Sequence, residues 1–207
     1  MNLIRVCSFL LATLVAVAQA PLARAVDITI TMDDLPFQAV HGLVHPTGVQ
    51  FGFTVGGIPS FDANYASGGP GAGVFIADPS IEGSTAGVLS IVFPAPTPIF
   101  EFGLARSDFA EIPAGAAVEL FDASNASLGV TNLPLSPLVG FSEGQFTYSG
   151  TPIKRATVDF TTDGFSPRFA FDNLTFRLIP EPATLLLGLV GCASALSARR
   201  RRSVATR

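Results

Sequence analysis

Two pairs of oxygen-bearing side chains, far apart in the sequence, have the chemistry to bind a metal ion together. Asp33-Asp34 ends the first alternating segment of the chain, and Asp172-Asn173 lies within the last one. If these segments are neighbouring strands, Asp34, Asp172 and Asn173 can converge on a hard cation such as Ca²⁺, which takes six to eight oxygen ligands. The alternative is structural, because the same side chains can cap turns or accept hydrogen bonds from loop amides.

Two other motifs have the letters of a binding site but the wrong surroundings. His41 and His45 have the i, i+4 spacing of a helical zinc pair, but Gly42 and Pro46 oppose a helix there, so we interpret both histidines as loop residues. The glycine-rich run 68–73 is followed by neither a Lys-Ser pair nor a helix, so it predicts a loop rather than a phosphate cradle.

Carboxylates are numerous enough to supply the acid and base of a glycoside hydrolase. The candidates are Asp62, Asp78, Glu82, Asp108, Glu111 and Glu143. Any acidic β-rich protein offers such pairs, and no nucleophile elbow with a partner histidine is present. We therefore predict no catalytic residue and no enzymatic activity, and we keep a polysaccharide hydrolase as the alternative to a binding function.

The elements that must position these residues are strands. Polar and apolar residues alternate in short segments separated by turn clusters rich in Gly, Asp, Asn and Pro, and no long window has a helical apolar stripe. The predicted strands are Asp27–Met32, Val49–Val55, Gly73–Ala77, Val88–Phe93, Ile99–Arg106, Ala116–Phe121, Ser127–Leu133, Leu138–Tyr148, Ile153–Thr161 and Arg168–Arg177. Short strands at this spacing predict an all-β fold, an antiparallel β-sandwich.

One predicted strand is irregular. Phe169, Phe171, Leu174 and Phe176 do not keep one strict alternation, because Asp172-Asn173 interrupts it. We therefore predict a bulge or a register change between Phe171 and Leu174 that turns the polar pair toward a site or a turn.

Charge and cysteine content narrow the function of the central region, residues 26–178. It contains five basic and fifteen acidic residues, a net charge of −10, although the whole chain has a net charge of −4. A domain with this much negative charge repels phosphate backbones, and we therefore predict no nucleic-acid partner. Cations and neutral glycans are compatible with the charge. Both cysteines, Cys7 and Cys192, lie outside this region, so it has no disulfide and its stability depends on core packing.

The N-terminus has the plan of a secretory signal peptide. Arg5 precedes an apolar segment, residues 6–17, and two small-residue sites follow, at residues 18–20 and 23–25. We predict cleavage after Ala25, because Pro21 would directly follow the earlier site and proline is a poor neighbour for an extended scissile bond.

The last 29 residues combine three parts in a fixed order. Ile179-Pro180-Glu181-Pro182 is followed by sixteen uncharged residues, 183–198, and then by Arg199-Arg200-Arg201-Arg202. A basic cluster after an apolar segment predicts a membrane helix with its C-terminus in the cytoplasm. At about 1.5 Å per residue this helix measures roughly 24 Å, short of the roughly 30 Å hydrocarbon core, so it is a marginal permanent anchor.

This order of parts resembles the C-terminal sorting signal of PEP-CTERM proteins, which Gram-negative bacteria process with a membrane enzyme called exosortase. The resemblance covers only residues 179–207 and implies export, temporary anchoring in the inner membrane through residues 183–198, and removal of the tail. An ordinary C-terminal anchor is the alternative, although Pro180, Glu181 and Pro182 have no role in it.

A second resemblance covers the later part of the central region. The segments 99–104, 118–122, 127–130, 139–141, 153–160 and 171–176 look like the jelly-roll domains often found ahead of such tails. Those domains are similar to carbohydrate-binding modules and lectins, which implies glycan binding. This chain lacks tryptophan, the usual sugar-stacking side chain, so Tyr65, Tyr148 or exposed phenylalanines would have to replace it.

These patterns together predict an exported, non-enzymatic surface protein with three parts: a signal peptide (1–25), a β-sandwich domain (26–178) and a sorting tail (179–207). We expect it to bind or structure exopolysaccharide in the cell envelope or extracellular matrix of a biofilm, with Ca²⁺ as a candidate cofactor and exosortase as the processing partner.

Overall fold

The computed structural model describes residues 25–160 and 168–179, which form eleven antiparallel strands. The strands are β1 (Val26–Ile30), β2 (Gln38–Ala39), β3 (Gln50–Val55), β4 (Ile58–Pro59), β5 (Asn64–Ser67), β6 (Ser80–Ser84), β7 (Gly87–Arg106), β8 (Ile112–Phe121), β9 (Ser127–Leu138), β10 (Phe141–Asp159) and β11 (Arg168–Leu178). Within these residues no helix is long and apolar enough to span a bilayer. The predicted helix 183–198 lies outside them.

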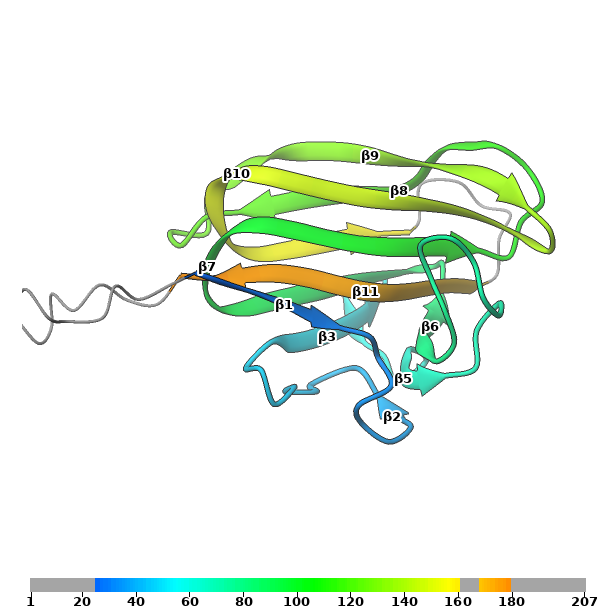
Figure 1. The fold of residues 1–207 in the computed structure, drawn as a ribbon, viewed down its shortest axis with the longest axis horizontal. Helices are drawn as coiled ribbons and strands as arrows, with labels where there is room; N and C mark the ends of the chain where they lie inside the picture. The colour runs from blue at the N-terminus through cyan, green and yellow to red at the C-terminus, as the bar shows by residue number, and fades with distance from the viewer. Residues whose placement is uncertain (1–24, 161–167, 180–207) are drawn as a thin grey trace, which may run out of the picture. The chain divides into compact units, whose positions relative to one another are not determined.

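The strands form two layers, and β7 and β10 contribute to both (Figure 1). In the first layer, here called sheet I, the order is β2, β5, β6, β11, the second half of β7 and the first half of β10, with β1 beside β6 along β11. In sheet II the order is β4, β3, the first half of β7, the second half of β10, β8 and β9. The predicted all-β antiparallel architecture is confirmed.

Prolines mark the place where β7 crosses between the layers, opposite an irregular part of β10. Thr97 of β7, between Pro96 and Pro98, pairs with Ile153 of β10, and the register shifts on both sides of Ile153. Proline donates no ladder hydrogen bond and so weakens pairing locally, which lets each strand bend. The segments predicted as separate strands, 88–93 and 99–106, are therefore the two halves of β7.

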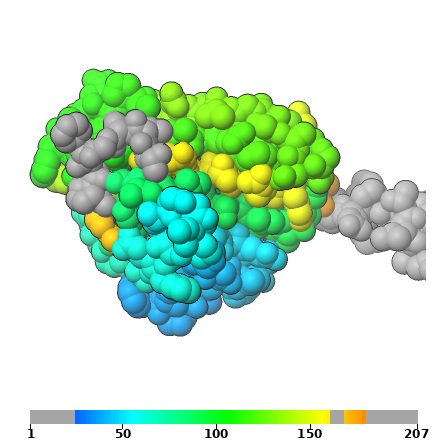
Figure 2. Space-filling model, turned by 180° about the vertical axis from the view of Figure 1, so that it is seen from behind, coloured from blue at the N-terminus to red at the C-terminus, as the bar shows by residue number. Residues whose placement is uncertain are grey.

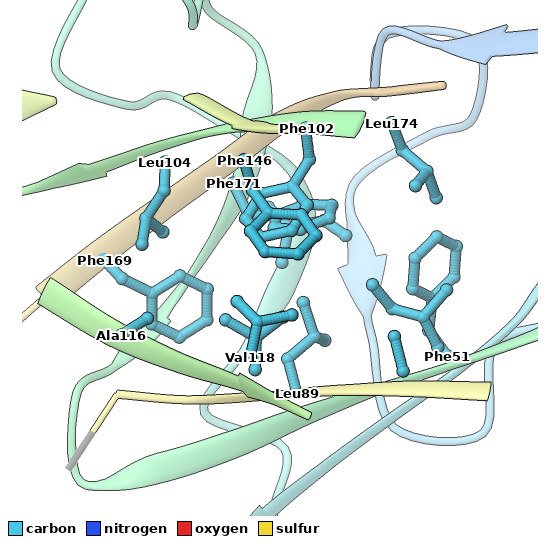
Figure 3. Close-up of a cluster of buried hydrophobic side chains, with 14 of the residues drawn as sticks. Phe51, Leu89, Phe102, Leu104, Ala116, Val118, Phe146, Phe169, Phe171 and Leu174 are labelled. Carbon is cyan, nitrogen blue, oxygen red and sulfur yellow. The ribbon is translucent and has the colours of Figure 1, made fainter. Parts of the chain in front are cut away.

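Stacked phenylalanines fill the space between the sheets. The ring of Phe102 lies 4.7 Å from that of Phe171 and 5.3 Å from that of Phe146, centroid to centroid, and Figure 3 shows these three side chains together. Phe160 stacks on Phe169 at 3.8 Å. Stacked pairs stabilise a core beyond the effect of their buried area, so aromatic packing contributes to the stability of this domain, which has no disulfide.

Two predictions about local backbone structure have opposite outcomes. The register of β11 against β7 shifts between Asp172 and Thr175, and Asn173 has a φ of 54°, which confirms the predicted bulge. The predicted strand Gly73–Ala77 is wrong: this segment belongs to the loop 68–79 between β5 and β6. Its amides bind side-chain carboxylates instead of a neighbouring strand, as described below.

The two ends of the described domain lie side by side. Val26 of β1 is paired with Leu178 of β11, and both strands reach the left-hand end of the view in Figure 1. Arg168, the first residue of β11, lies at the opposite end of that strand, roughly 33 Å away at about 3.3 Å per residue. Figure 2, seen from behind, shows the N-terminal part of the described chain, in blue to cyan, packed against the later part drawn in green and yellow.

Candidate functional site

A pocket of about 230 Å³ lies at the end of the sandwich that is remote from Val26 and Leu178. Five segments meet there: the loop 68–79, β6, the end of β7, the turn between β9 and β10, and the start of β11. The lining residues are Gly69, Pro70, Glu82, Ala105, Arg106, Ser107, Gly140, Phe141, Arg168, Phe169 and Ala170. We call this hollow the end pocket.

The polar lining of the end pocket offers both hydrogen-bond donors and acceptors. Glu82 accepts a hydrogen bond from the Ser67 hydroxyl at 3.0 Å. The Arg168 side chain is 41% exposed and forms an ion pair with Asp62 at 3.0 Å. Arg106 differs, because its side chain is buried and its Nη1 donates to the Gly115 carbonyl at 2.9 Å. Glu82 and Arg168 are thus placed to meet a ligand, whereas Arg106 supports the wall.

Two exposed apolar residues are close in sequence to residues that line the pocket. Phe109, two residues after Ser107, is 75% exposed, and Val139, directly before Gly140, is 94% exposed. The Ser142 hydroxyl lies 3.2 Å from the Asp108 carbonyl and 2.6 Å from the Ala110 carbonyl, which fixes the loop on both sides of Phe109. These hydrogen bonds therefore hold the loop in a conformation that exposes the Phe109 side chain.

The loop 68–79 forms one wall of the pocket and is held down by two buried carboxylates. Glu143 accepts a hydrogen bond from the Val74 amide at 2.8 Å, and Asp172 accepts one from the Ala77 amide at 2.9 Å. In Figure 1 this loop, in teal, crosses in front of the right-hand parts of β7 and β11. Because the loop amides are satisfied by side chains, the segment can lie flat on sheet I without joining it.

The bulge at Asp172-Asn173 completes this attachment. The Asn173 side-chain amide donates to the Phe75 carbonyl at 3.0 Å. Beneath that carbonyl lies Gly103, where a Cβ atom would come within 2.0 Å of the Phe75 oxygen. Ile76 packs in a small apolar cluster with Ala105, Phe141 and Ala170.

Burial makes Asp172 sensitive to pH. Its side chain is almost fully buried, and this desolvation raises its pKa to about 6 from 3.8, despite hydrogen bonds from the Ala77 and Asn173 amides that act in the other direction. The charges of Asp33 and Asp78 add to the rise. The folded state therefore binds this proton more tightly than the unfolded chain does.

We expect the Asp172 contribution to stability to fall as the pH rises from about 4 to about 6, because the folded carboxyl must ionise while buried. Asp172→Asn should remove this part of the pH dependence, although it also loses one acceptor for the loop amides. Urea unfolding at pH 4, 5, 6 and 7 measures the effect, with Glu111→Gln, at an exposed position between β7 and β8, as control. Equal slopes for the wild type and Asp172→Asn would show that Asp172 does not titrate in this range.

The residues predicted as metal ligands have different partners. Asp34 accepts hydrogen bonds from the Tyr65 hydroxyl at 2.5 Å and from His45 Nε2 at 2.6 Å. Asp172 and Asn173 bind the loop 68–79 instead, which is the structural role weighed against metal binding. Among the residues that the structure describes, no three His, Cys, Asp or Glu side chains gather in a way that could hold a metal ion. Ca²⁺ binding by Asp34, Asp172 and Asn173 stays a prediction.

The network around Asp34 ties a second loop together. His45 is buried and its Nδ1 accepts from the Thr47 amide, so its Nε2 carries the proton donated to Asp34. Burial raises the pKa of Asp34, but the hydrogen bonds from Tyr65 and His45 outweigh it and lower that pKa below 3.8. Burial, together with the hydrogen bond to the same carboxylate, raises the pKa of Tyr65 far above its ordinary value. His41 lies apart from this network and accepts from the Phe53 amide.

The predicted sorting residues lie outside the described part of the chain. They are Pro180, Glu181, Pro182, Arg199, Arg200, Arg201 and Arg202. Ala25, the predicted cleavage position, is exposed and directly precedes β1. An exposed junction ahead of the first strand is compatible with cleavage there, which stays a prediction.

No protein-family model and no curated protein matches this chain. Several solved structures resemble it in architecture. A point mutant of the carbohydrate-binding module CBM29-2 has 10% sequence identity and a TM-score of 0.39, over 74% of this chain and 92% of that one. A structure described as a carbohydrate binding module of family 29 has 11% identity and a TM-score of 0.38, over 76% of this chain and 96% of that one. The enzymatically active domain of bacteriophage CBA120 tailspike protein 4 has 10% identity and a TM-score of 0.34, over 67% of this chain and 21% of that one.

Similarity at this level does not indicate a ligand, so the chemistry of the end pocket depends on the residues that line it. In the sequence Glu82 is only one of six candidate acids, and no pattern there predicts Arg168 or Ser107 as binding residues. The available signals were the glycine-rich run 68–73 and the isolated arginines of an acidic domain. Neither signal shows that the segments meet.

Proposed function

We propose that this chain is an exported surface protein that binds saccharide in the end pocket. The observation that carries the proposal is the composition of the pocket: its lining includes a carboxylate (Glu82), a guanidinium (Arg168) and the apolar residues Pro70 and Phe141. Sugar hydroxyl groups both donate and accept hydrogen bonds, so they suit a mixed pair of this kind. The C–H faces of a sugar ring suit the apolar walls.

The volume of the end pocket limits the length of the ligand. Pockets for drug-sized ligands usually measure roughly 300–1,000 Å³, and the end pocket measures about 230 Å³. This space suits one sugar unit, such as the end or a branch of a polysaccharide, rather than several consecutive units. Phe109 and Val139 then offer apolar contacts to the units outside.

The hydrolase alternative is less well supported. Glycoside hydrolases generally need two carboxyl groups on either side of the scissile bond, roughly 5 to 9.5 Å apart. Glu82 is the one carboxylate in the described lining of the end pocket. The nearby Asp78 carboxylate lies beside Gly69 on the same side as Glu82 and already accepts the Gly69 amide, so the two acids do not flank a bond from opposite sides. A single acid can bind a hydroxyl group but cannot supply both an acid and a base, so binding is the better interpretation.

The pocket proposal predicts that filling the hollow abolishes binding. A glycan array on the purified chain identifies a saccharide, and calorimetry with that saccharide then compares variants. Ser107→Trp should lower the affinity at least tenfold, because the indole occupies the pocket. The matched control is Thr147→Trp, an exposed position on the outer face of sheet I. If Thr147→Trp abolishes binding and Ser107→Trp does not, the saccharide binds on the face of sheet I and not in the end pocket. If the array shows no bound saccharide at all, the proposed binding function is wrong.

Export and tail processing are a separate part of the proposal, supported by the sequence of residues 179–207. Replacing Pro180, Glu181 and Pro182 with alanine should block removal of the tail, and replacing Arg199–Arg202 with serine should weaken the charge barrier that stops transfer. Intact-mass analysis of the exported protein tests both changes. A wild-type mature protein that still ends at Arg207 would contradict processing.

A further inference from the structure

Three side-chain oxygens converge beside Gly69, on the loop wall of the end pocket. The position that a Cβ atom of Gly69 would take is 2.6 Å from Asp78 Oδ1, 2.7 Å from Ser80 Oγ and 3.6 Å from Glu82 Oε1. A side chain at residue 69 would collide with the first two oxygens, so only glycine fits against them. Each pair of these oxygens therefore lies within roughly 6 Å, comparable to the span of one cation with ligands at 2.3–2.6 Å.

The local sequence explains why these oxygens share one face. Ser80 and Glu82 are two residues apart in β6, so both side chains point to the outer side of sheet I, while Ile81 between them enters the core. Asp78 precedes Ser80 by two residues and accepts the Gly69 amide at 2.6 Å. The Ser67 hydroxyl reaches Glu82 from the paired strand β5.

Ser80 is the member of this group that lacks an explanation within the fold. Its side chain is fully buried, and among the described residues its Oγ has no hydrogen-bond partner. A buried hydroxyl without a partner costs roughly 1–3 kcal/mol, so such groups usually have a ligand or an ordered water. The Ser80 oxygen lies close to the Gly69 backbone, as do the carboxylate oxygens of Asp78 and Glu82.

We propose that Asp78, Ser80 and Glu82 form a binding site for a divalent cation of the Ca²⁺ type. Two carboxylates and a hydroxyl are hard oxygen ligands, and Ca²⁺ accepts incomplete sets of protein ligands because water or other oxygens complete its six to eight positions. The exposed Asp78 leaves a path from solvent. This site is distinct from the predicted set of Asp34, Asp172 and Asn173.

The proposed cation is placed to affect ligand binding. Glu82 lines the end pocket and also faces the cation site, as does Gly69. A bound cation would fix the Glu82 carboxylate and would leave coordination positions directed toward the pocket, which saccharide hydroxyl groups can fill. This consequence rests on the proposed saccharide function, whereas the cation site itself does not.

The test is a calorimetric titration of the EDTA-treated full chain with CaCl₂ alone. We expect one saturable site in the wild type and affinity at least tenfold weaker in Asp78→Asn and Ser80→Ala, because each removes a ligand. Glu119→Gln is the charge-matched control for Asp78→Asn, since Glu119 lies on the outer face of sheet II. Ser80→Ala should fold normally, because it removes only a hydroxyl without a partner.

Several outcomes would overturn the cation site. The proposal fails if the wild type shows no saturable binding, if Glu119→Gln weakens binding as much as Asp78→Asn, or if Asp34→Asn abolishes binding while Asp78→Asn does not. Saccharide binding measured with CaCl₂ and with EDTA is a separate arm. If no saccharide binds under either condition, the proposed function fails, and the CaCl₂ titration still decides the cation site.

Discussion

Replacing Phe171 with alanine should lower the free energy of unfolding by about 3 to 5 kcal/mol. Phe171 is fully buried in the middle of β11 and stacks on Phe102 at 4.7 Å between centroids. The truncation removes both the buried area and the stacking, and its neighbours are held in two sheets that cannot close the cavity freely. A loss of this size is a large part of the stability of a domain that has no disulfide.

Chemical denaturation of the full chain measures the effect of Phe171→Ala. Phe109→Ala is the matched control, because it removes the same ring from a position that is 75% exposed and should change stability by less than about 0.5 kcal/mol. Similar losses in the two variants would show that Phe171 is not a core residue.

Adding a side chain at Gly103 should detach the loop 68–79. In Gly103→Val the new Cβ atom would lie 2.0 Å from the Phe75 carbonyl oxygen, and the obstacle is backbone, which cannot rotate away. Overpacking usually costs about 1–3 kcal/mol, and we expect the upper end of this range. Because Gly69 and Pro70 belong to the displaced loop, saccharide and cation binding should both weaken.

Hydrogen exchange at the Val74 and Ala77 amides reports this detachment directly, because both are bound to buried carboxylates in the native structure. Gly68→Ala is the control: it lies in the same loop, and no atom is within 4 Å of its added Cβ. Continued protection of both amides in Gly103→Val would contradict the role of Gly103 as the contact that lets the loop lie on the sheet.

The strands of the core were predictable because every second side chain faces the core and must be apolar, which leaves a visible alternation in the sequence. In β11 the sequence also predicted where the alternation fails, since Asp172 cannot be buried in register with Phe171 without a partner. The same reasoning failed at Gly73–Ala77. An apolar run there suggested a strand, but Ile76 covers the outside of sheet I, and its neighbours Val74 and Ala77 donate to side chains from β10 and β11. The spacing of apolar residues alone does not distinguish a strand within a sheet from a loop that covers the outside of one.

The candidate site was less predictable than the fold because it depends on contacts between distant segments. Glu82, Ser107 and Arg168 are separated by more than twenty residues each, and only the pairing of β11 with both β6 and β7 brings them to one hollow. The short strand β6 itself was missed, since its sequence Ser-Ile-Glu-Gly-Ser has a single bulky apolar residue. Without a predicted strand at β6, the sequence could not indicate that Ser80 and Glu82 lie on the same face of a sheet.

The position of β11 also determines how the domain would respond to a pulling force. Any load applied through residues after Leu178 enters at the end of a strand that is hydrogen-bonded along its length to β7 on one side and to β1 and β6 on the other. A force along the strand axis loads these hydrogen bonds in shear, all together, instead of opening them one after another. A protein held by its C-terminal tail would therefore be loaded in shear along β11, while the Arg168–Asp62 ion pair and the end pocket lie at the far end of the same strand, away from the point where the force enters.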